Sequence, residues 1–174
     1  AYLGLLEKAK DVAPLHAPAI LDEIYAAKAL VPHATHYGIS DSAFHTSMPV
    51  HRRMIGLPRS DVTQHDIGRF GYHGLSMSSI ARRCESFFGV APDRVIVCHI
   101  GGGISATALH YQESVDTSMG YSPASGIMMG SRVGMFDADA LVELMPRTGM
   151  RDITQLPQYL NTAVGFQGLT GFSV

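Results

Sequence analysis

The chain has 174 residues, of which 46% are hydrophobic and 16% charged, and its formal net charge is −2. This composition predicts a globular protein with a hydrophobic core, and the length suits one sizeable domain or part of a larger one. The low net charge argues against nucleic acid as the main partner. No apolar run approaches the roughly 20 residues that span a bilayer, and no signal peptide opens the chain, so we expect no membrane partner and a cytoplasmic protein.

The first third of the chain is predicted to be helical and then extended. The opening AYLGLLEKAK has a helical pattern, and apolar residues recur at helical spacing over residues 18–30, after a proline at the permitted first turn. Residues 33–40, HATHYGIS, are predicted to form a short strand that runs into Asp41. Residues 49–66 are rich in Arg, His and Pro, which predicts a loop with short turns.

The middle of the chain is predicted to be a helix followed by two strands. The helix covers residues 75–88 and ends at Gly89. Residues 94–100 form a continuous apolar run, which is typical of a strand covered on both faces. Residues 104–111 alternate enough to be its antiparallel neighbour.

The last third is predicted to be an irregular segment followed by two helices. Residues 114–134 are rich in Gly, Ser and Met, and the helices lie near residues 137–145 and 153–163. The whole pattern is mixed α/β, without the β-α-β alternation or the GxGxxG motif of a dinucleotide-binding fold. The apolar ending GLTGFSV suggests that the chain is part of a larger fold.

The two cysteines are predicted to be buried thiols rather than a disulfide. Cys84 lies in the amphipathic helical stretch and Cys98 in the apolar strand. The chain also has nine histidines, but no HExxH motif and no zinc-finger spacing. A zinc site is therefore not favoured.

Several short stretches allow either a structural or a catalytic interpretation. The triplet Gly101-Gly102-Gly103, next to His99, suits a tight turn with positive φ or a cradle of backbone N–H groups for a phosphate. Asp41, at the end of a predicted strand, can cap a helix or orient reacting groups.

Two further residues leave the same choice open. His73 lies between two glycines in RFGYHGLS and can be structural or donate a hydrogen bond to an anion. Arg132 stands alone in the long Gly/Ser/Met-rich loop and can form a buried salt bridge or face an anion.

Taken in order, five motifs resemble the acetate kinase family of short-chain carboxylate kinases. APLHAP resembles the family's APLHNP, SDSAFHTSMP its FDTAFHxTMP, and RFGYHGLS its RYGFHGTSH. VIVCHIGGGIS is similar to the strand that ends in HLGNGAS, and SVDTSMGYSPASGIMMGSRVG to SxDTSMGFTPLEGxMMGTRSG. The resemblance implies an actin-like, sugar-kinase-like fold of two α/β lobes, with residues 1–90 in the first lobe and 91–174 opening the second. It also implies reversible phosphoryl transfer from ATP, with Mg²⁺, to acetate or propionate, giving acyl phosphate, in a homodimer.

The resemblance also implies roles for individual residues. Asp41, His73 and Arg132 match the catalytic aspartate, histidine and arginine of the family, with Asp41 also a candidate for indirect contact with Mg²⁺. The remaining matches are His16, Leu15, Tyr72 and Pro123 for the carboxylate substrate and its acyl chain, and His99, Gly101, Gly102 and Gly103 for the nucleotide phosphates.

Departures from the family motifs favour a second interpretation. Gly102 replaces an asparagine, Met77 the second histidine of HGTSH, and Met135 an acid that follows the arginine. The alternative is therefore a degenerate or fragmentary member that binds phosphate or nucleotide weakly without catalysis.

Overall fold

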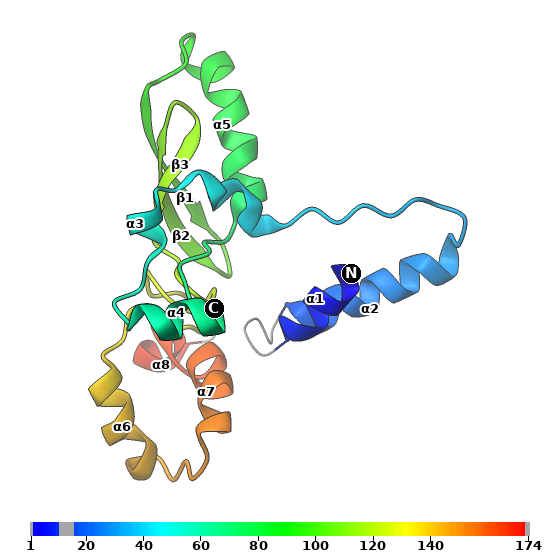
Figure 1. The fold of residues 1–174 in the computed structure, drawn as a ribbon. Coiled ribbons are helices and arrows are strands. Elements are labelled where there is room, and N and C mark those ends of the chain that lie inside the picture. The colour runs from blue at the N-terminus through cyan, green and yellow to red at the C-terminus, as the bar shows by residue number, and fades with distance from the viewer. Residues whose placement is uncertain (1, 11–15, 173–174) are drawn as a thin grey trace. The chain divides into compact units, whose positions relative to one another are not determined.

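The computed structural model describes residues 2–10 and 16–172, which divide between Ser40 and Asp41 into two compact units (Figure 1). The first unit contains α1 (Tyr2–Lys8) and α2 (Ala17–Leu30), so both helices predicted for this region are confirmed. The strand predicted for residues 33–40 is wrong. The described part of this unit contains no strand, and an extended segment without a partner leaves its backbone groups to water.

The second unit begins with short helices that lead to one long one. They are the 3₁₀-helix η1 (Asp41–Ser47), α3 (Val50–Arg53), α4 (Arg59–His65) and α5 (Gly74–Phe88). The loop predicted for residues 49–66 thus contains two helical turns. Each starts directly after a proline, Pro49 or Pro58, at the N-cap position.

α5 confirms the long helix predicted from the sequence. It ends at Gly89, whose φ of +75° is the left-handed conformation that glycine adopts without strain. Met77, Ala81 and Cys84 are buried at helical spacing along one face. Met77, which replaces the second histidine of the family motif, is therefore a core residue here.

Three antiparallel strands form a sheet in the order β1-β2-β3. They are β1 (Arg94–Ile100), β2 (Ile104–His110) and β3 (Glu113–Thr117). The register pairs Val97 with Thr107 and His99 with Ser105, which confirms the predicted antiparallel neighbours. The sequence predicts an irregular segment over residues 114–134, but the first four of these residues belong to β3. The chain becomes irregular only after Thr117.

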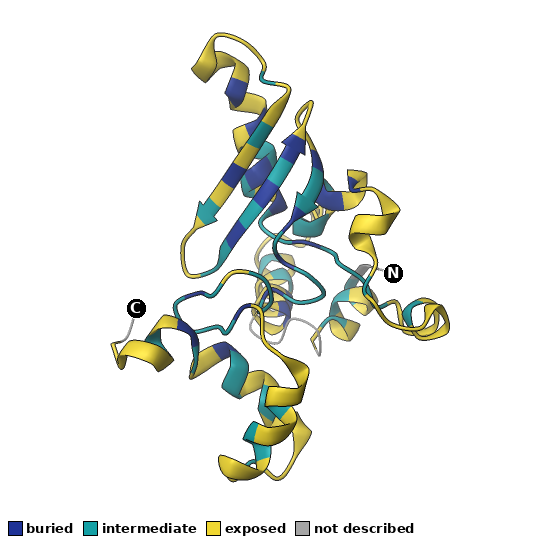
Figure 2. Cartoon of the chain, turned by 90° about the vertical axis from the view of Figure 1, so that its left-hand side faces the viewer, coloured by how far each residue is buried: buried dark blue, intermediate teal, exposed yellow. Residues whose placement is uncertain are grey.

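One face of the sheet is covered by α5, and the other carries no helix (Figures 1 and 2). On the covered face, Val97 and Leu109 form the core with Met77 and Ala81. On the open face, Ile96 is 74% and Ile100 79% exposed. The prediction that both faces of this strand are covered is therefore wrong for this chain.

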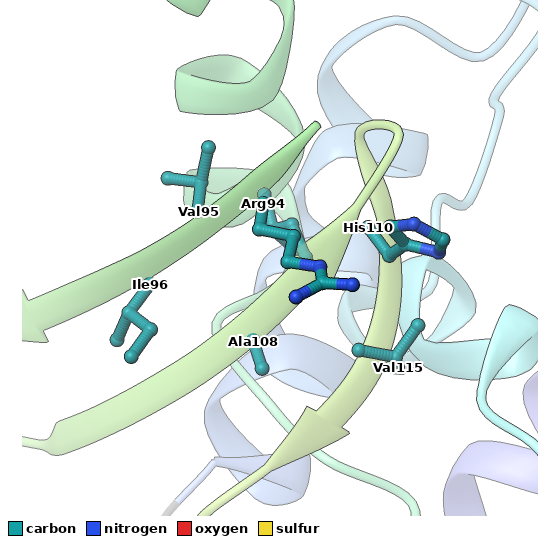
Figure 3. A pocket seen from close by; sticks show the side chains of 7 residues that line it. Arg94, Val95, Ile96, Ala108, His110 and Val115 are labelled. Atoms are coloured by element: carbon teal, nitrogen blue, oxygen red, sulfur yellow. The ribbon is translucent and has the colours of Figure 1, made fainter. Parts of the chain in front are cut away.

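The open face is hollowed by a shallow groove of about 530 Å³ (Figure 3). Arg94 and His110 stand at one end beside Ala108 and Val115. Cys98 also lies on β1 and is exposed, so the prediction of two buried thiols holds only for Cys84. Both cysteines are free, as predicted.

The C-terminal part confirms two predicted helical regions and adds a short helix. These elements are α6 (Ala138–Arg147), η2 (Ile153–Gln155), α7 (Leu156–Thr162) and α8 (Gly165–Thr170). Asp137 caps α6 by accepting hydrogen bonds from the backbone N–H groups of Asp139 and Ala140. Among the helices of residues 2–10 and 16–172, none is long and apolar enough to cross a membrane.

The predicted mixed α/β fold class is confirmed by this combination of helices and a sheet. The expected lobe boundary near residue 90 concerns a complete two-lobed protein and stays a prediction. The described chain divides instead at residue 40, and the sheet and α5 belong to one unit.

Candidate functional site

The side chains of His73 and Arg132 meet at the glycine turn between β1 and β2. A Cβ atom added to Gly103 would lie 2.9 Å from Nε2 of His73 and 3.2 Å from Nη1 of Arg132. Three segments that are distant in sequence therefore converge on one point. One imidazole nitrogen and one guanidinium nitrogen therefore face a backbone position that carries no side chain.

Space, rather than backbone conformation, explains the glycine at position 103. The three glycines form the predicted tight turn between the paired residues Ile100 and Ile104, but none has a φ in the left-handed region, so a need for positive φ does not explain them. Gly102 is exposed, and a Cβ there would meet nothing within 4 Å. A Cβ on Gly101 would lie 3.5 Å from Nε2 of His99. The tight position is Gly103, and Gly102 has room for a side chain.

His73 and His99 stack on each other, with ring centroids 3.9 Å apart and an interplanar angle of 20°. Each imidazole has a serine at Nδ1. Ser105 Oγ lies 2.9 Å from Nδ1 of His73, and Ser76 Oγ lies 3.1 Å from Nδ1 of His99. The serines hold the inner edges of the rings, so the Nε2 atoms are on the side of the glycine turn.

Asp41 holds the start of α5. Its carboxylate oxygens accept hydrogen bonds from the backbone N–H groups of His73 and Leu75, the latter at 3.0 Å. A Cβ on Gly74 would collide with the Asp41 carbonyl oxygen, so η1 and α5 are in close contact. The structure therefore shows the capping geometry for Asp41, on a helix 32 residues away in sequence. This position also keeps its negative charge next to His73.

Arg132 is half-buried, and no carboxylate of the described residues pairs with it. Its Nη1 donates to the carbonyl oxygen of Pro123 at 3.3 Å, and its Nε is buried without a hydrogen-bond partner among the described residues. No ion pair of Arg132 occurs in that part of the chain, so the salt-bridge interpretation does not hold there. Burial lowers the pKa of this guanidinium, which nevertheless stays charged at neutral pH.

The loop after β3 connects Arg132 to Tyr72. The hydroxyl of Tyr72 donates to the carbonyl oxygen of Tyr121 at 2.8 Å, and Pro123, two residues on, is buried. Burial, together with nearby Tyr121 and Asp41, raises the pKa of Tyr72 to about 12. Tyr72 therefore stays neutral and keeps this donor contact to the loop.

Two expected site residues are not placed in this cluster. His16 is exposed at the start of α2 and belongs to the first unit, whereas the cluster belongs to the second. Leu15 lies outside the described residues.

The sequence reasoning missed three polar residues that support the cluster. Ser105 and Ser76 hold the two imidazoles, and His45, which is 1% exposed, binds the carbonyl oxygen of Tyr72. A signal for Ser105 was present, because the predicted pairing of the two strands, with its polar residues at alternate positions, puts it on the face of His99. His45 had no signal beyond its place in the SDSAFHTSMP motif.

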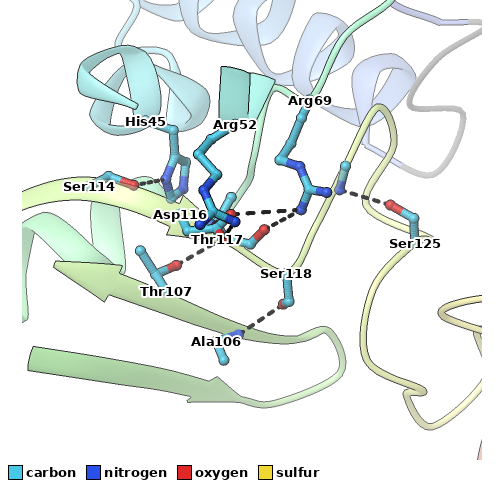
Figure 4. A network of polar contacts seen from close by, with 11 residues as sticks. His45, Arg52, Arg69, Ala106, Thr107, Ser114, Asp116, Thr117, Ser118 and Ser125 are labelled. Carbon is cyan, nitrogen blue, oxygen red and sulfur yellow. Dashed lines mark hydrogen bonds and ion pairs between the residues drawn. The ribbon is translucent and has the colours of Figure 1, made fainter. Parts of the chain in front are cut away.

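A second polar network lies beside the cluster at the end of β3 (Figure 4). Asp116 lies 3.1 Å from Nη1 of Arg52 and 4.0 Å from Nη1 of Arg69. Arg69 also donates to the carbonyl oxygen of Thr117 at 2.6 Å. These arginines have a carboxylate partner, which Arg132 lacks among the described residues.

A metal site built from protein side chains alone is absent from residues 2–10 and 16–172. No three His, Cys, Asp or Glu side chains gather there as a ligand set. Mg²⁺ in phosphoryl-transfer sites commonly needs only one or two carboxylates besides phosphates and water, and Asp41 is the carboxylate of this cluster. The donor set therefore fits Mg²⁺ that arrives with a phosphorylated substrate.

A converging arginine and histidine at a side-chain-free turn define a site suited to a small anion such as a phosphoryl or carboxylate group. The model of the acetokinase family matches residues 3–174. The chain therefore belongs to the acetokinase family.

Curated relatives and solved structures agree with this assignment. The chain is 38% identical to the acetate kinase of Oceanobacillus iheyensis, over 97% of this chain and 43% of the relative. It is 40% identical to the acetate kinase of Parabacteroides distasonis, over 94% and 41%. A propionate kinase from Francisella tularensis superposes with a TM-score of 0.90 at 30% identity, over 97% of this chain and 44% of the other. The Porphyromonas gingivalis acetate kinase gives 0.84 at 33% identity, over 98% and 43%.

The resemblance stated from the motifs and the expected fold are thereby confirmed, since the chain has the fold of the matching part of these kinases. The chain spans less than half the length of the curated relatives it matches.

Proposed function

We propose that this chain is part of a short-chain carboxylate kinase that transfers the γ-phosphoryl group of ATP to acetate or propionate, giving acyl phosphate and ADP. The observation that carries the proposal is the convergence of His73 Nε2 and Arg132 Nη1 on Gly103. In phosphoryl transfer, charge spreads over the equatorial oxygens of the transferred group, so catalysis consists mainly of positioning and electrostatic stabilisation.

In this proposal Arg132 clamps the phosphoryl group or the acceptor carboxylate, and His73 donates a hydrogen bond from Nε2. Burial of Arg132 strengthens such a contact, because little water competes for the guanidinium. The absence of a carboxylate partner among the described residues leaves its charge available to an anion. The turn at Gly101, Gly102 and Gly103 lets nucleotide phosphates approach the backbone, and His99 lies beside them.

Asp41 has two roles in this proposal. It holds the backbone of His73, and its carboxylate would be available to Mg²⁺ that arrives with the phosphates. The metal ion, when bound, neutralises charge on the nucleotide phosphates.

The acceptor is placed on the side of Tyr72 and Pro123. Tyr72 is fixed by its hydrogen bond to Tyr121, and Pro123 by burial and by Arg132. Two rigid walls suit a short acyl chain. The family resemblance also assigns Leu15 and His16 to the substrate. The proposal includes two lobes that meet near residue 90, a homodimer and a cytoplasmic location.

The second candidate function is weak binding of phosphate or nucleotide without catalysis. Gly102, where the family motif has an asparagine, is exposed and offers no side-chain donor.

The test uses the longest reading frame that contains this chain, assayed with Mg-ATP, acetate, propionate or butyrate, and hydroxylamine to trap acyl phosphate. We expect acyl hydroxamate, and Arg132→Ala should lower kcat by roughly 10²–10³-fold, the cost of one lost charge-stabilising donor. Arg52→Ala is the matched control, because Arg52 is exposed and pairs with Asp116 away from the cluster. Absence of hydroxamate from all three acids, with ADP still bound in calorimetry, would establish the second candidate instead.

A further inference from the structure

His73 has a strained backbone in this structure. Its φ of 61° and ψ of 22° place it in the left-handed region, directly before the first residue of α5. This conformation is unfavourable for a residue with a Cβ. It persists only where the surroundings hold it, and such strain clusters at functional sites.

Three contacts from two elements, η1 and β2, hold the segment around His73. The Asp41 carboxylate accepts the His73 N–H, and Ser105 Oγ lies 2.9 Å from its Nδ1. The third contact acts on the other side of the peptide bond, where Nε2 of His45 lies 3.0 Å from the carbonyl oxygen of Tyr72. This carbonyl belongs to the Tyr72–His73 peptide, so His45 sets the orientation of the plane that precedes the strained residue.

His45 is itself fixed by its surroundings. It is 1% exposed, and its Nδ1 lies 2.9 Å from the hydroxyl of Ser114, at the start of β3 (Figure 4). The ring fills the space left by Gly71, where a Cβ would lie 2.6 Å from Cδ2 of His45. η1, β3 and the 71–73 loop thus meet at one imidazole.

The partners of His45 determine which of its nitrogens carries the proton. The carbonyl oxygen of Tyr72 can only accept, so Nε2 must donate. In the neutral ring Nδ1 is then an acceptor, and the Ser114 hydroxyl donates to it. Burial favours the neutral ring and lowers the pKa of His45.

We propose that His45 is a positioning residue of the kinase: by donating from Nε2 to the Tyr72 carbonyl it fixes the Tyr72–His73 peptide, and so aims the His73 imidazole at the phosphoryl site. His45 does not touch the reacting groups. This inference rests on the proposed function.

Two variants of the same position separate its two hydrogen bonds. His45→Gln keeps an N–H group close to Nε2 and can still donate to Tyr72, whereas His45→Asn can reach only Ser114. A displacement of about 1 Å at a catalytic group costs on the order of 10²-fold in rate, so we expect His45→Asn to lower kcat by about that factor. The KM values should stay within about threefold, because ground-state binding is not what His73 orientation controls. His45→Gln should recover kcat to within about tenfold of the parent.

The unfolding midpoints of the two variants provide the control for folding. Both lose one buried hydrogen bond, so we expect similar midpoints, and a difference in kcat then reports on the Tyr72 contact. A His45→Asn variant with parental kcat, or equal kcat in the two variants, overturns the proposal.

A second measurement is independent of activity. In ¹⁵N-histidine-labelled protein we expect His45 as the Nε2–H tautomer, and the imidazole signals of His73 should move in His45→Asn but not in His45→Gln. An Nδ1–H tautomer, or unmoved His73 signals in both variants, contradicts the positioning role. If the parent makes no acyl phosphate, the proposed function fails, and these spectra still decide whether His45 aims His73.

Discussion

The two faces of the β1–β2–β3 sheet differ in where their polar and apolar side chains lie. The face under α5 buries hydroxyl groups, with Ser105 and Thr107 both at 0% exposure. The open face presents isoleucines to water, with Ile96 74% and Ile100 79% exposed.

The difference shows what each face does in this chain. Buried hydroxyls cost free energy unless they are hydrogen-bonded, and those of the covered face are: Thr107 to Thr117 at 3.0 Å, and Ser105 to His73. Their directional contacts hold the candidate site. The isoleucines of the open face gain little from folding of this chain, because they remain in water. A contiguous exposed apolar surface is typical of an interaction face.

The largest expected effect comes from placing a charge on each face in turn. Val97→Asp should unfold the chain, losing more than about 4 kcal/mol, because Val97 is 7% exposed and packs with Met77, Ala81 and Leu109. Ile96→Asp, one residue earlier and facing water, should change the free energy of unfolding by no more than about 0.5 kcal/mol. Urea unfolding followed by circular dichroism measures both. Equal losses would mean that the two faces do not differ.

The next effect concerns neighbouring glycines at the end of the sheet. Gly103→Ala should lower kcat on the order of 10²-fold, because the new Cβ would displace His73 and Arg132. Gly102→Ala is the matched control and should stay within about twofold, since nothing lies within 4 Å of the position of its Cβ. The hydroxylamine assay on the complete kinase measures both. Loss of activity in Gly102→Ala alone would contradict the convergence on Gly103.

A smaller effect is the pH dependence of stability from His45 on the covered side. Burial lowers the pKa of His45 below its ordinary 6.5, although the Tyr72 carbonyl and nearby Asp41 oppose this shift. Below pH 6.5 the unfolded chain therefore binds a proton that the folded chain does not. The contribution of the neutral ring is complete above pH 6.5 and is lost as the pH falls from 6.5 towards the folded-state pKa.

The measurement that checks this is the free energy of unfolding as a function of pH. Its slope is compared between about pH 5 and pH 7, the range in which a histidine titrates. His45→Gln should make this slope shallower. A parental slope in His45→Gln would show that His45 is not the group responsible.

The smallest expected effect is a difference in thiol labelling between the two cysteines, which requires no mutation. Cys98 is exposed on β1 and Cys84 is buried under the covered face, so a thiol reagent should label one cysteine per native chain and two after unfolding. Mass spectrometry of the labelled peptides identifies the site. Rapid labelling of Cys84 in the native chain would contradict the packing of α5.

Local pattern predicted the elements whose stability is local. The spacing of apolar residues indicated α2 and α5, and the apolar and alternating runs indicated β1 and β2. The sequence did not predict the short helices α3 and α4, because a proline is common both in loops and at the start of a helix. The strand predicted at residues 33–40 failed because a strand needs a partner, and apolar pattern does not reveal whether one is present.

The sequence by itself determined the family and the mixed α/β class, because ordered motifs identify residues by type and position. It also predicted Asp41, His73 and Arg132 as site residues. It left open whether Asp41 caps a helix, whether Arg132 has a salt-bridge partner, and why the turn contains glycines. Only the tertiary structure decided these, since each depends on atoms far apart in the chain: Asp41 with the start of α5, Arg132 with Pro123, Gly103 with His73. Hydrogen-bond partners and free space are properties of three-dimensional packing, and a linear pattern does not contain them.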